Sequence, residues 1–60
     1  MTEATFRELL EMAILASEEL GGELVDTRSY RETGLLTRNE GLVIRLRDDS
    51  EFQIQIVQSA

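Results

Sequence analysis

The densest group of residues that could do chemistry is the acidic run Asp48-Asp49-Ser50-Glu51. Carboxylate and hydroxyl oxygens are the ligands that Ca²⁺ and Mg²⁺ prefer, so the run has the composition of a metal-binding loop. It lacks the alternating ligands, the central glycine and the terminal glutamate of a calcium loop. Asp and Ser are also common turn residues. We therefore predict a turn over residues 48–50 and no metal site.

Paired glutamates could supply general acid–base catalysis, which needs a carboxyl group whose pKa is shifted by its surroundings. The N-terminal part of the chain has two such pairs, Glu8 with Glu11 and Glu18 with Glu19. The sequence indicates no apolar pocket beside either pair that would raise a carboxyl pKa. It also contains no histidine and no cysteine for nucleophilic catalysis or metal binding. We therefore expect a non-enzymatic protein without catalytic residues or cofactors.

A second polar group lies near the C-terminus and consists of Arg45, Arg47, Gln53 and Gln55. Arginine and glutamine contact phosphates and base edges, so these residues form a candidate nucleic-acid surface. The net charge of −6 opposes this function, because phosphate contacts dominate the affinity for nucleic acid. The group also has no aromatic side chain for base stacking. We expect a solvated sheet face here and keep weak nucleic-acid binding as an alternative.

Two alternating segments, residues 41–47 and 51–57, position these polar side chains. Apolar residues at every second position on both sides of a turn predict two antiparallel strands with one buried face. A three-residue loop over residues 48–50 then fixes the pairing. The expected pairs are Leu46 with Phe52, Ile44 with Ile54, Leu42 with Ile56, and Arg47 with Glu51.

Residues 5–20 are expected to form one helix that covers the apolar face of this hairpin. Thr5 and Glu8 fit a capping box, with Thr2 as an alternative cap, and Gly21-Gly22 is expected to end the helix. At 100° per residue, one side of the helix is apolar. This stripe consists of Phe6, Leu9, Leu10, Ala13, Ser17 and Leu20, with Ala16 at its edge.

The opposite side of the helix combines apolar and acidic residues. Leu15 points away from the apolar stripe and Met12 lies on its flank; the acids around them are Glu8, Glu11, Glu18 and Glu19. An apolar centre with a charged rim is typical of a protein contact patch. A single exposed leucine is also normal on soluble proteins, so both interpretations stay open.

The middle of the chain predicts a weaker strand over residues 23–28. Ser29 and Glu32 then fit a capping box for one helical turn that Gly34 would end. The alternative, which we favour, is a broken strand that continues through residues 35–37 and places Leu36 opposite Ile44. Tyr30 is expected at the rim of the sheet. The sequence thus predicts one α+β domain over residues 1–60, with an N-terminal helix packed on a three-stranded antiparallel sheet (α-β-β-β).

The charge is distributed unevenly along the chain. Residues 1–23 contain six glutamates against Arg7, whereas residues 24–60 contain six acids against five arginines. The N-terminus has neither the basic start nor the apolar run of a signal peptide, and no stretch approaches the ~18 apolar residues of a membrane span. We expect a soluble cytoplasmic protein without a membrane contact.

The pattern GLLT, EGLVI and SEFQ within residues 34–53 resembles small acidic proteins encoded in phage and prophage genomes. The resemblance covers the C-terminal half and brings no catalytic motif or functional residue. Such proteins are accessory factors, either structural helpers or inhibitors that bind a host protein complex, some by presenting an acidic surface as nucleic acid does. The resemblance implies another protein as the partner.

Two leading hypotheses follow. In the first, the chain is an interaction module that binds a basic protein surface through the outer helix face with Met12 and Leu15. In the second, it forms a homo-oligomer, either through the last strand as an open edge or through Leu15 and Met12 on the helix.

Overall fold

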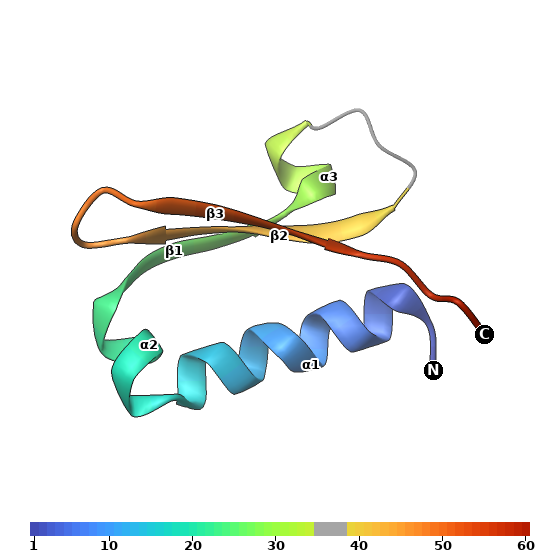
Figure 1. The fold of residues 1–60 in the computed structure, drawn as a ribbon, viewed down its shortest axis with the longest axis horizontal. Helices are drawn as coiled ribbons and strands as arrows, with labels where there is room; N and C mark the ends of the chain where they lie inside the picture. The colour runs from blue at the N-terminus through green and yellow to red at the C-terminus, as the bar shows by residue number, and fades with distance from the viewer. Residues whose placement is uncertain (35–38) are drawn as a thin grey trace.

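The computed structural model describes residues 1–34 and 39–60. An N-terminal helical region precedes a three-stranded antiparallel sheet, which confirms the predicted α+β fold (Figure 1). The elements are α1 (Glu3–Ala16), α2 (Glu18–Glu23), β1 (Leu24–Ser29), α3 (Tyr30–Thr33), β2 (Glu40–Leu46) and β3 (Glu51–Ile56). The strand order is β1-β2-β3, so β2 is central and β3 lies at an edge.

The predicted single helix over residues 5–20 is wrong, because the chain bends at Ser17. Thr2 is the N-cap, since its side chain accepts a hydrogen bond from the Thr5 amide at 3.1 Å, and α1 therefore begins at Glu3. At Ser17 the backbone is extended, and its hydroxyl accepts a hydrogen bond from the Leu20 amide at 3.3 Å. Ser17 thereby ends α1 and caps α2, as serine side chains often do.

The glycine pair at residues 21 and 22 does not end the helix, contrary to the prediction, because α2 continues to Glu23. Gly21 instead allows the bend. A Cβ atom on Gly21 would lie 2.6 Å from the carbonyl oxygen of Leu15, which is closer than real contacts allow. Only glycine lets this turn of α2 lie against the end of α1.

The pairing of β2 with β3 differs from the prediction by two residues. Ile44 lies opposite Phe52, and Arg45, not Arg47, lies opposite Glu51. The predicted residue pairs are therefore wrong. Because the side-chain period of a strand is two, this shift keeps the same residues on the same sheet face.

The hairpin loop explains the shift. The Leu46 amide donates to the Ser50 carbonyl at 2.9 Å, and the Asp49 amide donates to the Leu46 carbonyl at 3.0 Å, so the three loop residues are 47–49. Asp49 takes the left-handed conformation that this loop type needs, with φ of 70°. The carboxylate of Asp48 accepts hydrogen bonds from the amide and hydroxyl of Ser50.

The other neighbour of β2 is β1, with Thr27 opposite Ile44. Ile44 thus has partners on both sides, Thr27 and Phe52, so the predicted pairing of Leu36 with Ile44 is wrong. Leu36 itself lies outside the described residues. The register of β1 shifts between Leu24 and Asp26, which marks a β-bulge and leaves Val25 exposed.

After β1 the chain forms the helical turn α3 and not the broken strand that we favoured. The Ser29 hydroxyl accepts from the Glu32 amide at 3.2 Å, and the Glu32 carboxylate accepts from the Ser29 amide at 3.1 Å. This is a complete capping box, and Gly34 ends the turn with φ of 77°. The predicted continuation over residues 35–37 lies outside the described residues.

Helices lie on both sides of the sheet (Figure 1). We call the side toward α1 the inner face and the side toward α3 the outer face. On the outer face the Tyr30 ring lies directly over Gly41, and a Cβ atom on Gly41 would overlap that ring. Tyr30 is buried there, whereas we had expected it at the rim of the sheet.

The core lies between α1 and the inner face of the sheet. Leu42 is completely buried, and it forms a cluster with Ile14 of α1 and Ile44 of β2. The partly buried residues packed against this cluster are Leu10, Leu24, Leu46 and Ile54. Ile14 was not part of the predicted stripe, so α1 is rotated about its axis relative to the prediction.

Candidate protein-interaction surfaces

The rotation of α1 turns a charged flank of the helix toward the sheet. The guanidinium group of Arg7 lies 2.5 Å from Glu11 Oε1 and 3.1 Å from Glu40 Oε2, which is at the start of β2. Glu11 also accepts a hydrogen bond from the Thr27 hydroxyl at 3.2 Å. Arg7 and Glu11 are therefore partly buried and bind α1 to β1 and β2.

Glu11 consequently does not belong to the outer patch in which we had placed it. The structure keeps three of the predicted residues together on the exposed side of α1: Glu8, Met12 and Leu15. The Met12 and Leu15 side chains are 64% and 58% exposed. Because of the bend at Ser17, the other two acids, Glu18 and Glu19, lie in the first turn of α2, where both are exposed.

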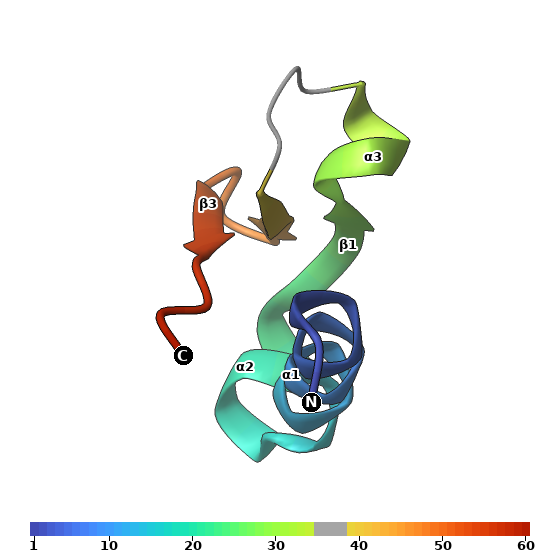
Figure 2. The same cartoon turned by 90° about the vertical axis from the view of Figure 1, so that its right-hand side faces the viewer.

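The predicted apolar stripe of α1 has an unexpected position. α1 contacts β2 and β1, and Figure 2 shows β3 displaced to one side, away from α1. The stripe residues Phe6 and Leu9 consequently remain 48% and 47% exposed. One helix thus covers two of the three strands, and of the stripe residues Phe6 and Leu20 line the space beside β3, whereas Leu10 packs against the core.

Two hollows lie between the helices and β3, and together we call them the β3 groove. The first has a volume of about 340 Å³ and is lined by apolar side chains and one glutamine: Ile14, Leu20, Ile44, Leu46, Phe52, Gln53 and Ile54. The second, of about 380 Å³, lies beside the chain termini and is lined by Met1, Thr2, Glu3, Phe6, Ile56, Val57, Gln58 and Ala60. The groove was not predicted from the sequence.

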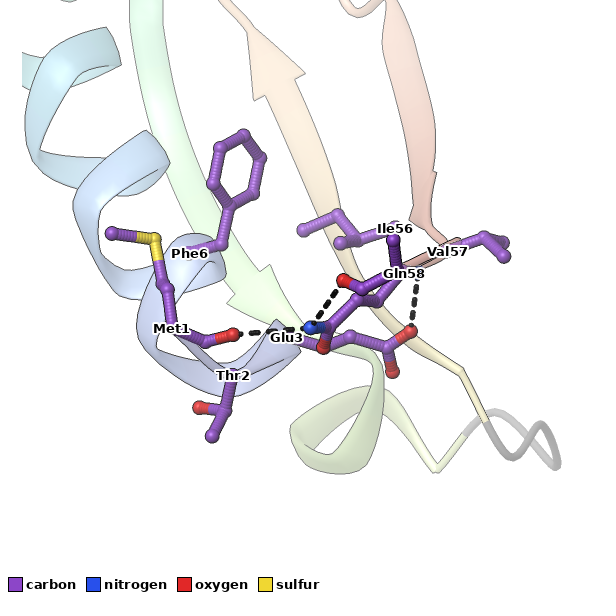
Figure 3. A pocket seen from close by; sticks show the side chains of 8 residues that line it. Met1, Thr2, Glu3, Phe6, Ile56, Val57 and Gln58 are labelled. Carbon is purple, nitrogen blue, oxygen red and sulfur yellow. Dashed lines mark hydrogen bonds between the residues drawn. The ribbon is translucent and has the colours of Figure 1, made fainter.

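The terminal hollow is held together by the two ends of the chain (Figure 3). The Gln58 amide donates to Glu3 Oε2 at 2.8 Å, and the Gln58 side chain donates to the carbonyl oxygens of Met1 at 3.3 Å and Ala60 at 3.0 Å. The Phe6 ring and Ile56 line the hollow from opposite sides. These hydrogen bonds fix the C-terminal tail beside α1.

The outer face separates the two arginines of the nucleic-acid alternative. Arg45 lies on β2 between Asp26 of β1 and Glu51 of β3. Arg47 lies in the hairpin loop, where its amide donates to the Glu23 carbonyl at 2.8 Å. The face therefore has charges of both signs, which is a poor arrangement for phosphate binding.

The glutamines of the same group, Gln53 and Gln55, are exposed on β3. A hollow of about 180 Å³ beside Arg45 has both acids and bases in its lining. Arg28 in this lining pairs with Asp26 at 2.8 Å. The outer face is thus solvated only in part: Arg45, Gln53 and Gln55 are exposed as expected, whereas Val43 is buried, contrary to the prediction.

Two carboxyl groups have clearly shifted pKa values. Hydrogen bonds from the Ser29 amide lower the pKa of Glu32, and hydrogen bonds from the Ser50 hydroxyl and amide lower the pKa of Asp48. Both carboxylates are exposed and complete local turns. Within residues 1–34 and 39–60, no group of three or more acidic, cysteine or histidine side chains could hold a metal ion.

No protein-family model matches the chain, and no curated protein or solved structure shows significant similarity to it. In the parts of the chain that the structure describes, none of the helices has the length and apolar character needed to span a membrane.

Proposed function

We propose that this protein is a non-enzymatic interaction module that binds a basic surface of another protein. Its binding surface, the acidic face, consists of Glu8, Met12, Leu15, Glu18 and Glu19. The observation that supports this proposal is the exposure of Met12 and Leu15, at 64% and 58%, beside exposed glutamates.

The charge around this face supports a basic partner. Arg7 is the only basic side chain in residues 1–23, and its guanidinium group is turned toward Glu11 and Glu40 on the side of the sheet. Arg7 also lies 3.9 Å from Glu8 at the rim of the face, but the face holds three glutamates against this one arginine, so the outward side of α1 and α2 keeps an excess of negative charge. Such a field steers a basic partner toward the face, and the two apolar side chains supply the area buried on contact.

A nucleic-acid-binding site on a host protein is one basic surface of this kind. The resemblance of the C-terminal half to small acidic phage-encoded proteins fits an accessory or inhibitor of that type, which would act in the cytoplasm. In this version of the proposal the acidic face occupies the site that nucleic acid would otherwise fill.

The test is capture of proteins from a host lysate on the immobilised chain, followed by elution with rising salt. We expect Leu15→Arg to abolish capture, because it places a positive charge at the centre of the acidic face. Gln55→Arg adds the same charge on the outer face and should capture as the natural chain does. Equal capture by the natural chain and Leu15→Arg would contradict the proposal, and so would no capture by the natural chain. Addition of oligonucleotide should release the captured protein if that protein uses a nucleic-acid site.

A further inference from the structure

We infer that the β3 groove and the free edge of β3 are covered by a second copy of this chain, in a two-fold dimer in which the two β3 strands pair antiparallel. This inference does not rest on the acidic face, which lies on another side of α1. It assigns an occupant to a large apolar surface that the described part of the chain leaves open.

The two edges of the sheet differ in a way that favours β3. β1 has a bulge between Leu24 and Asp26, and such irregularities protect an edge against pairing. β3 pairs with β2 over residues 51–56 without a register shift, and it contains no proline and no lysine. A regular, unprotected edge strand is a template for another strand.

The chemistry of the groove favours an apolar occupant. Phe52 on β3 is 54% exposed beside the first hollow of the groove, of about 340 Å³, and that hollow has no ionisable side chain in its lining. In the terminal hollow the one charged side chain is Glu3, whose carboxylate already accepts a hydrogen bond from the Gln58 amide. The hollow beside the hairpin therefore offers no charged partner to a basic helix or a phosphate, and the terminal hollow offers only the Glu3 carboxylate.

The solvent-accessible area of the isolated chain is larger than expected, by about the area that one partner would cover. The chain exposes 4602 Å², whereas a compact monomer of its 6.8 kDa mass is expected to expose about 3,950 Å². The difference of about 650 Å² is close to the roughly 800 Å² that each partner buries in a standard protein interface. The radius of gyration, 11.7 Å, also exceeds the roughly 10.4 Å expected for 60 residues.

A second copy fits this surface because the contact is self-complementary. A two-fold axis normal to the sheet keeps the inner faces of both copies on the same side, so the two grooves join beneath a continuous six-stranded sheet. In an antiparallel register that keeps apolar residues inward, Phe52 lies opposite Ile54 or Ile56 of the second copy. Glu51 is the only charged residue of β3, and neither register places it opposite another charge.

The test is the solution mass by light scattering, from low micromolar to millimolar concentration. We expect twice the chain mass of 6.8 kDa at high concentration, and a decline toward that mass on dilution. Phe52→Glu should raise the dissociation constant of the dimer by about ten-fold or more, because it places a charge among the joined grooves. Val25→Glu changes a residue on the β1 edge that is 61% exposed, compared with 54% for Phe52, and should leave the dissociation constant unchanged.

A monomer at millimolar concentration would overturn the inference. So would a dimer that dissociates in Val25→Glu or Leu15→Arg but not in Phe52→Glu, since the contact would then use β1 or the acidic face. Amide hydrogen exchange keeps the test independent of the variants. We expect the amides of β3 to exchange more slowly as the concentration rises, while those of β1 do not change.

Discussion

The guanidinium group of Arg7 on α1 lies 3.1 Å from Glu40 Oε2 at the start of β2, across 33 positions of the sequence. The same group lies 2.5 Å from Glu11 Oε1, and Glu11 in turn accepts from Thr27 on β1. One partly buried arginine therefore connects α1 to two strands, and its charge balances two carboxylates that face the interior.

Removal of Arg7 should therefore destabilise the fold. We expect Arg7→Ala to lower the free energy of unfolding by about 1–2 kcal/mol, because Glu11 and Glu40 would remain partly buried without their cation. Arg28→Ala is the matched control, since Arg28 pairs with Asp26 at an exposed position, and it should cost less than about 0.5 kcal/mol. Urea unfolding measures both values. Equal losses in the two variants would show that Arg7 has no special role.

The two neighbouring glycines of α2 should respond in opposite ways to alanine. Gly22→Ala should stabilise the protein by about 0.5–1 kcal/mol, because nothing lies within 4 Å of the added Cβ and alanine favours a helix. Gly21→Ala should destabilise it by about 1–3 kcal/mol, because the Cβ would collide with the Leu15 carbonyl oxygen. Thermal unfolding of both variants is the measurement. Stabilisation by Gly21→Ala would mean that the bend at Ser17 is more open than described.

The capping box of α3 predicts a pH dependence of stability. The Ser29 hydrogen bonds make the pKa of Glu32 lower in the folded than in the unfolded chain, so the folded chain binds fewer protons. The contribution of Glu32 is therefore complete above its ordinary pKa of 4.5 and is lost as the pH falls through the lower folded pKa.

The measurement is urea unfolding of the natural chain and of Glu32→Gln at several pH values. We expect the natural chain to be the more stable at neutral pH, and the difference to shrink below pH 4.5. Asp48 is shifted in the same direction, so Asp48→Asn should show the same trend at the hairpin loop. A difference that does not change with pH would contradict this account.

The fold class was predictable because the alternation in residues 41–47 and 51–57 and the helical pattern of residues 5–20 indicate different elements. The register of the hairpin was not. A shift by two residues leaves each side chain on its face, so hydrophobic alternation cannot distinguish the two registers. The deciding feature is the left-handed conformation of Asp49. The loop contains no glycine, so its sequence did not indicate which residue adopts this conformation.

The candidate site was predictable in part for a similar reason. Met12, Leu15 and Glu8 are exposed as expected, whereas Glu11 is turned inward. Charged residues usually face water, but Arg7 and Glu11 neutralise each other and can therefore lie beside the sheet. The β3 groove could not be predicted, because it depends on how many strands one helix covers.

The contact of Tyr30 with Gly41 has a consequence for spectroscopy. Tyr30 is the only tyrosine and the chain contains no tryptophan, so its intrinsic fluorescence comes from one ring on the outer face. That signal reports whether α3 is docked on the sheet and is insensitive to α1 and to the β3 groove. Far-ultraviolet circular dichroism, in contrast, follows the helices and the sheet together. A difference between the two unfolding curves would therefore show that α3 detaches before the rest of the protein unfolds.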